Sequence, residues 1–361
     1  MVKSFRILLV SVFIWVSGTI LFAEEHEGKA AEEQQFDALG MIMHHISDSH
    51  FWHVIAFEKK DGSVFEISIP LPVILIYDGS IHLFLSSAFH HGKSVVQKGN
   101  HFFKLHHDKI YVTDAAGELT FSEDGTPENI KPLDFSITKN VASMWMSVLI
   151  IFALFVSSAR KYKGKPSAPS GIQSFVEPLI LFVRDDIVIE QIGEEKADRF
   201  MPFLLTVFFF VWINNLIGLI PFFPGGSNVS GNIAFTFTLA LFAFILINVN
   251  GTKTYWKDIF ATPGVPGMVR IILIPIEVVG IFTKPFALMI RLFANITAGH
   301  IVILSLTSLV FILKTVYVSP VSMSLTLFMF LLELLVGLLQ AYIFTLLSAL
   351  FIGMAVHNEE H

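Results

Sequence analysis

An arginine lies inside a long apolar stretch near the end of the chain. Arg291 has Leu, Met, Ile, Phe and Ala as neighbours, and Asn295 and His300 follow it. A guanidinium stays charged at any working pH, so burial cannot neutralise it. Placing one at the centre of a bilayer costs about 2.5–3.5 kcal/mol on insertion scales. Arg291 is therefore the first candidate functional residue.

Other polar residues share one side of the same predicted helix. Lys284 and Glu277 lie seven and fourteen positions before Arg291, and Asn295 lies four positions after it. At about 100° per residue, all three fall within about 40° of the direction of Arg291, whereas His300 falls about 180° away. The spacing predicts a polar stripe centred on the arginine, with the histidine facing a different neighbour.

A final predicted helix carries Glu333 and Gln340, seven residues apart and on one face. Imidazole and carboxylate groups exchange protons near neutral pH, whereas a buried guanidinium does not. Acids and histidines inside a membrane mark proton relays. The pattern predicts a proton-handling pair, His300 and Glu333, set apart from the fixed charge of Arg291.

Simpler explanations exist for these residues taken one at a time. Lys284 and Glu277 would snorkel to water if they lie near the cytoplasmic interface. An amide such as Gln340 would serve as a helix–helix hydrogen bond. Glu333 and Arg291 would form a structural ion pair. The combination of five polar residue types in two neighbouring helices favours a functional explanation.

Composition places the whole chain in a membrane. Of its 361 residues, 53% are hydrophobic and only 15% are charged, which excludes a disordered or ordinary soluble protein. The net charge of −6 gives nucleic acid no basic surface to bind. The chain has no cysteine, which excludes disulfides and thiolate metal sites.

The N-terminal third is predicted to lie outside the cytoplasm. Residues 1–23 combine a basic start, an apolar centre and Ala23, which is typical of a signal peptide cleaved after that alanine; a retained first span is the alternative. Residues 24–135 are polar, and turn dipeptides such as Asp78-Gly79 separate short runs of Val, Ile and Phe. We expect a small β-rich extracytoplasmic domain.

Two strand predictions are specific enough to test. Residues 64–69 alternate partly and are expected to form a strand, and residues 109–113 are expected to pair with residues 118–121 around Gly117.

This domain is also rich in histidine. Eleven of the fourteen histidines lie between His26 and His107. Metal binding or proton collection would use such residues, but no obvious acidic or thiolate set accompanies the paired histidines. We favour a structural or assembly role, and we predict neither a metal nor a cofactor.

Residues 136–361 are predicted to form an all-α polytopic membrane domain. An amphipathic interfacial helix is expected at about 170–196. Arg160 and Lys161, followed by two further lysines, place the end of the first span inside the cell. We expect about five membrane helices, at about 140–159, 200–221, 232–249, 271–313 and 321–356.

The last two of these helices are expected to be long and tilted. Apolar character persists from about 271 to 313, far beyond the ~20 residues that cross a bilayer. One tilted helix and two separate spans both fit this length. The C-terminal tail after residue 356 is expected in the cytoplasm.

The motifs around the candidate residues resemble the a subunit of F-type ATP synthase. They are Lys284-Pro285, Arg291-Leu-Phe-Ala-Asn295-Ile-Thr-Ala-Gly-His300, and Glu333 with Leu339-Gln340-Ala341. Weaker support comes from Asn215-Leu-Ile-Gly-Leu-Ile-Pro221. The resemblance covers about residues 135–361.

The resemblance implies a stationary proton-channel subunit in a bacterial inner membrane. Its partners would be the c-ring, the peripheral-stalk b subunits, the other synthase subunits and the lipid bilayer. Arg291 would face the carboxylate of the ring between two half-channels. The outer half-channel would use His300, Glu333, Asn295 and Gln340, and the inner one Glu277.

The chain itself is not expected to act on ATP. Gly92-Lys93-Ser94 lacks the glycine that a phosphate-binding loop requires five residues upstream, where Ser87 stands. Two departures from the family pattern stand out. Some members have the acid and the histidine of the pair exchanged, and Gly218 stands where other members have an acid.

Two other classes of function compete with this one. A secondary transporter would use Arg291 to bind an anionic solute, but such proteins usually show internal repeats and broken helices, and the sequence shows neither. A membrane anchor that displays the N-terminal domain would leave the intramembrane charges without a purpose.

Overall fold

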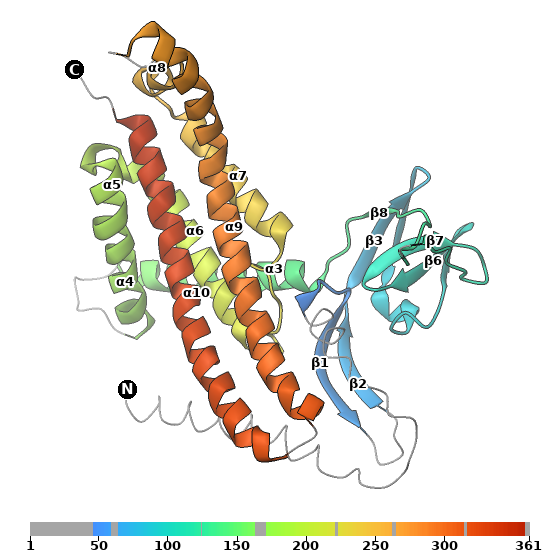
Figure 1. Ribbon diagram of the computed structural model, residues 1–361. Coiled ribbons are helices and arrows are strands. Elements are labelled where there is room, and N and C mark those ends of the chain that lie inside the picture. The colour runs from blue at the N-terminus through green and yellow to red at the C-terminus, as the bar shows by residue number, and fades with distance from the viewer. Residues whose placement is uncertain are drawn as a thin grey trace.

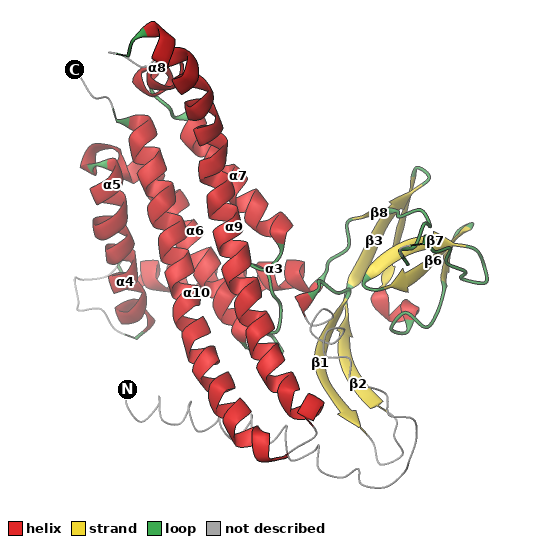
Figure 2. Ribbon diagram, viewed as in Figure 1, coloured by secondary structure: helices red, strands yellow, loops and turns green. Residues whose placement is uncertain are grey.

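The computed structural model describes residues 46–58, 64–123, 125–162, 171–220, 223–261, 265–313 and 316–357. The predicted signal peptide lies outside the described residues. The described chain is mostly helical, and a β-rich region precedes the helices (Figures 1 and 2). This confirms a polytopic helical protein with an N-terminal β-rich region.

Four helices in the described chain are long and apolar enough to cross a membrane. A fifth candidate is a pair of shorter helices, α7 and α8, which meet at an angle of 98°. The helices are α3 (Lys139–Lys161), α6 (Glu194–Leu219), α7 (Ile233–Val249), α8 (Lys253–Ala261), α9 (Gly267–Leu313) and α10 (Ser319–Val356).

Helix α9 runs unbroken for 47 residues, through both Pro275 and Pro285. It is therefore one helix rather than two. At 1.5 Å per residue it is about 70 Å long, more than twice the ~30 Å hydrocarbon core of a bilayer. Helix α10 lies beside it along its length, and α3 packs against α6 behind them in Figure 1. A helix of this length fits within a bilayer only if it is steeply tilted.

Helix α6 begins earlier than its apolar segment. It starts at Glu194, and Glu194 and Glu195 lie in its first turn. Carboxylates are favourable at a helix N-terminus, where the backbone N–H groups point outward. Hydropathy marks where a span becomes apolar, which is about six residues after this helix begins.

The predicted amphipathic segment is helical. It consists of α4 (Ile172–Phe182), a π-helical turn η2 (Val183–Ile189) and α5 (Glu190–Ile192). Val183, Ile187 and Val188 are buried, whereas Arg184 and Asp185 are exposed. The η2 turn therefore has a buried apolar side and an exposed polar side, whereas α4 also exposes Ile172, Phe175 and Leu181.

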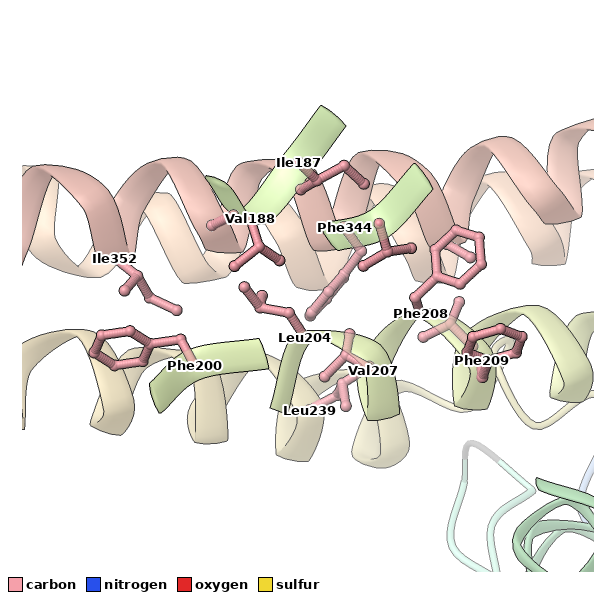
Figure 3. Close-up of a cluster of buried hydrophobic side chains, with 14 of the residues drawn as sticks. Ile187, Val188, Phe200, Leu204, Val207, Phe208, Phe209, Leu239, Phe344 and Ile352 are labelled. Carbon is pink, nitrogen blue, oxygen red and sulfur yellow. The ribbon is translucent and has the colours of Figure 1, made fainter. Parts of the chain in front are cut away.

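The main core lies where this segment, α6 and α10 meet. Figure 3 shows its side chains converging from different helices, with Leu204 and Phe208 on α6, Phe344 and Ile352 on α10, and Ile187 on η2. Gly353 allows α10 to approach α5 closely, because an added Cβ would overlap the carbonyl oxygen of Gln191.

The β-rich region forms three small antiparallel sheets. Their orders are β1-β2, β4-β3-β8 and β5-β6-β7. The buried side chains that join the latter two include Leu75, Phe84, Phe89 and Phe103. The strands are β1 (Phe51–Glu58), β2 (Val64–Pro70), β3 (Pro72–Tyr77), β4 (Ser80–Leu85), β5 (Val96–Lys98), β6 (His101–His106), β7 (Lys109–Thr113) and β8 (Leu133–Asp134).

One strand prediction is confirmed and the predicted hairpin is wrong. Strand β2 covers the predicted residues 64–69. Strand β7 pairs with the preceding β6 instead of with residues 118–121. His107 and Asp108 both adopt positive φ, 46° and 59°, which suits a tight two-residue hairpin turn. Histidine is not an obvious turn residue, so the stronger signal of Gly117 was misleading.

The close approach at Gly353 gives a stability prediction. Gly353→Ala should push α10 away from α5 and lower the stability of the detergent-solubilised protein by about 1–3 kcal/mol, as overpacking does. The measurement is thermal unfolding. Gly280→Ala is the matched control, because an added Cβ on that glycine meets nothing within 4 Å. Equal unfolding temperatures for the two variants would contradict the packing described here.

Candidate functional site

Arg291 lies on an open face of α9. Its side chain is exposed, and it makes no hydrogen bond or ion pair with any described residue. Leu288, Leu292 and Ile296, spaced four residues apart, are buried in the core, about 60° to 140° around the helix from Arg291. The fixed charge therefore points away from the protein core and is accessible on this face of α9.

The other predicted stripe residues behave differently from one another. Glu277 and Asn295 are exposed, as Arg291 is. Lys284 is half-buried, with its ammonium 5.5 Å from the centre of the Phe351 ring on α10. The exposed stripe thus consists of Glu277, Arg291 and Asn295, and Lys284 turns towards the neighbouring helix.

Lys284 also lines a small cavity between α7, α8, α9 and α10. The other polar side chains at this cavity are Asn248 and Tyr255. The tyrosine hydroxyl lies 3.5 Å from the amide oxygen of Asn248. Sequence reasoning missed these two residues, since each is a single polar residue in an apolar or mixed segment.

Glu333 is buried on α10, where only 4% of its surface is exposed. Its carboxylate lies against the backbone of Gly299 on α9, so closely that a Cβ on that glycine would overlap it. One carboxylate oxygen has no hydrogen-bond partner among the described residues. Glu333 makes no ion pair with Arg291, so the simple structural explanation for these two residues does not apply.

His300 is directed towards α6. A Cβ added to Gly218 on α6 would lie 3.8 Å from Nε2 of His300 and 2.9 Å from the carbonyl oxygen of Ser227. The glycine therefore allows the carbonyl of Ser227 to approach α6 closely, and the imidazole of His300 lies within van der Waals distance of the same point. Gly299 and His300 are consecutive residues of α9. The carboxylate of Glu333, which contacts Gly299 from α10, therefore lies at the same height along α9 as His300.

This pair is well separated from the arginine. His300 follows Arg291 by nine residues, which is about 13 Å along the axis and half a turn around it. The continuous α9 keeps that separation rigid. The carboxylate of Glu333 contacts the residue next to His300, whereas Arg291 lies apart, on the opposite side of the helix from His300.

A polar face of α10 continues from Glu333 towards α6. Gln340 is 4% exposed, and the amide of Asn215 donates a hydrogen bond to the carbonyl of Gly337, at 3.0 Å. The residue before Asn215, Asn214, accepts a 2.8 Å hydrogen bond through its amide oxygen from the hydroxyl of Ser147 on α3. Asn214 and Ser147 were not among the predicted site residues. Adjacent asparagines inside an apolar span are the signal that would have found them.

The histidines of the N-terminal domain form pairs with acids. His50 lies 3.0 Å from Asp134, and His101 lies 3.7 Å from Asp78. Burial alone would raise the pKa of Asp134, but hydrogen bonds with His50 and Ser136 outweigh it and hold the pKa below its ordinary value. Among the described residues, no group of three or more acids and histidines is placed to hold a metal ion.

The arrangement allows two kinds of electrostatic control. A permanent cation on an exposed, membrane-level helix face attracts an anionic group on a partner and disfavours its protonation. A buried carboxylate beside an imidazole takes up and releases protons. The fixed cation and the groups able to exchange protons lie on α9 and α10, and they are separated in space.

Comparison with known proteins identifies the family of the chain. A family model described as "ATP synthase A chain" matches residues 141–353, which is more than half of the chain. A model described as a domain of unknown function matches residues 41–135.

Relatives match the chain over most of its length. The "ATP synthase subunit a" of Chloroherpeton thalassium is 47% identical over 233 residues, covering 63% of this chain and 69% of the relative. That of Chlorobium phaeobacteroides strain DSM 266 is 46% identical over 269 residues, covering 71% and 75%. That of Myxococcus xanthus is 42% identical over 238 residues, covering 63% and 77%. The chain belongs to the ATP synthase A chain family.

Proposed function

We propose that this chain is the proton-translocating stator subunit of an F-type ATP synthase. It provides two half-channels, and Arg291 between them faces the carboxylate of a rotating c-ring. Proton flow through the half-channels drives rotation, and the chemistry on ATP takes place in another subunit. The placement of Arg291 on an open face of α9, with Glu333 and His300 held behind it, carries this proposal.

Arg291 acts as a fixed charge. Each ring carboxylate that passes it is favoured in its ionised form, and so gives up its proton on one side and takes up another on the other side. The same charge repels a proton that would cross directly from one half-channel to the other. Each proton gains about 2.3 kcal/mol per 100 mV of membrane potential, so several protons suffice for one ATP.

The outer half-channel uses Glu333 and His300, with Asn295 and Gln340 as polar neighbours. The burial of Glu333 and Gln340 between α9, α10 and α6 supports this, because buried polar groups in a membrane usually line a cavity or a proton path. The inner half-channel passes Glu277, with Lys284 beside it.

The sidedness follows from the distribution of charge. Arg160 and Lys161 end α3, and Lys253 and Lys257 lie on α8. Positive residues mark the cytoplasmic side, so α9 enters from the inside and Arg291 precedes His300 on the way out. The protein is then a multi-pass bacterial inner-membrane protein with its N-terminal domain outside and its C-terminus in the cytoplasm.

The partners follow from the same proposal. The exposed stripe of α9 meets the c-ring, the peripheral-stalk b subunits contact other membrane helices, and lipid covers the rest.

The role of the fixed charge gives the first functional prediction. Arg291→Ala should reduce ATP synthesis in reconstituted vesicles to background, because the ring carboxylate loses the charge that favours its ionised form. Arg184→Ala is the matched control, since Arg184 is an exposed cation paired with Asp185 at 3.5 Å. It should synthesise ATP at the wild-type rate.

Both variants should assemble in normal amounts, which a native gel of the complex checks. Normal ATP-driven proton pumping in the Arg291→Ala complex would refute the proposed role.

The position of Glu333 gives a second prediction. Gly299→Ala should displace its carboxylate, at a packing cost of about 1–3 kcal/mol. If about 1.4 kcal/mol of this falls on proton transfer, the transport rate drops about tenfold. Vesicle acidification measures that rate, and Gly280→Ala on the same helix is the control. A wild-type rate in Gly299→Ala would mean that the position of Glu333 does not matter for transport.

A further inference from the structure

The described part of the loop between α6 and α7, residues 223–232, is largely buried against the membrane domain. Ser227, Val229 and Ser230 are at most 2% exposed, although the loop joins two membrane helices. A connecting loop usually runs over the surface. This loop instead folds inward, so that the carbonyl of Ser227 lies beside Gly218, next to the ring of His300.

The buried polar atoms of this loop lack protein partners. The hydroxyls of Ser227 and Ser230 and the amide nitrogen of Asn228 have no hydrogen-bond partner among the described residues. Buried polar groups of this kind are normally satisfied by ordered water. The loop is therefore expected to form a hydrated polar surface close to His300.

The N-terminal domain holds this loop. Trp52 on β1 is 7% exposed, and its indole N–H donates a 3.1 Å hydrogen bond to the carbonyl of Gly225. Its ring also packs edge-on against Phe223, with 5.2 Å between ring centres. Both contacts join the β-rich region to the loop that borders the imidazole.

The segment that carries Trp52 is itself fixed to α3. The carboxylate of Asp48 accepts hydrogen bonds from the hydroxyl of Thr138, at 2.7 Å, and from the backbone N–H of Asn140, at 3.1 Å. The backbone N–H of Lys139 donates to the carbonyl of Ser49, at 2.9 Å. The tryptophan therefore reaches the loop from a segment anchored at the start of a membrane helix.

We propose that Trp52 is a positioning residue for proton access. The N-terminal domain, through Trp52, holds residues 223–232 as the wall of the outer access path to His300. This inference rests on the proposed function, and it assigns a role to a region that the ATP synthase A chain model does not cover.

The absence of cysteine from the chain allows a direct test in the complete ATP synthase. Ser227→Cys places a single thiol in this subunit. A small charged methanethiosulfonate reagent, added on the side of the N-terminal domain, reports water access to the thiol, and mass spectrometry of the subunit measures its rate of reaction.

Trp52→Phe, combined with Ser227→Cys, removes the N–H donor but keeps an aromatic ring. Loss of one hydrogen bond should loosen the loop and raise the labelling rate between about twofold and tenfold. Passive proton conduction per assembled complex should fall severalfold. Trp145→Phe is the matched control, because Trp145 on α3 is 65% exposed; it should change neither rate.

Three outcomes would overturn the inference. The first is that the introduced thiol is not labelled in any variant. The second is that the labelling rate is the same with and without Trp52. The third is that the labelling rate changes while passive proton conduction does not. If Trp52→Phe does not assemble, Phe223→Leu removes the ring contact from the loop side and should shift both rates in the same directions.

A further variant separates this inference from the proposed function. His300→Ala should abolish proton conduction if the imidazole lies on the outer path. If it does, and Trp52→Phe leaves both rates unchanged, only the role of Trp52 fails. If His300→Ala conducts normally, the proposed outer half-channel itself is wrong.

Discussion

The rest of the structure depends on a guanidinium that keeps its charge at the level of the membrane. Such a charge is costly in an apolar surrounding and cannot be removed by losing a proton. The helix meets this constraint by burying Leu288, Leu292 and Ile296 on one flank while Arg291 remains on the exposed face. The arginine is therefore available to a partner, and the apolar side holds α9 against the core.

In the proposed function, the fixed charge of Arg291 and the proton-handling groups must not neutralise each other. An ion pair between Arg291 and Glu333 would cancel both functions. The unbroken α9 keeps them apart, because nine residues of rigid helix separate the arginine from His300. Two glycines allow the close contacts around Glu333 and His300. Gly299 admits the carboxylate of Glu333, and Gly218 allows the carbonyl of Ser227 to approach α6 close to His300.

The N-terminal domain is attached to the membrane domain through particular side chains. Its contacts with the membrane domain include hydrogen bonds made by Asp48 and Trp52 and the ring contact between Trp52 and Phe223. Burial is the largest influence on Asp48 and raises the pKa of its carboxyl, while hydrogen bonds from Thr138 and Asn140 act in the opposite direction. A half-buried acid with such partners ties the domain to the first turn of α3.

The sequence by itself determined the membrane class, the approximate helices and the opposite directions of Arg291 and His300. These depend on apolar length and helical periodicity, which are properties of one segment. Only the tertiary structure decided that Glu333 rests on Gly299, that β7 pairs with β6, and that Trp52 reaches Gly225 across 173 positions. Such contacts join segments whose spacing along the chain carries no information about their distance in space.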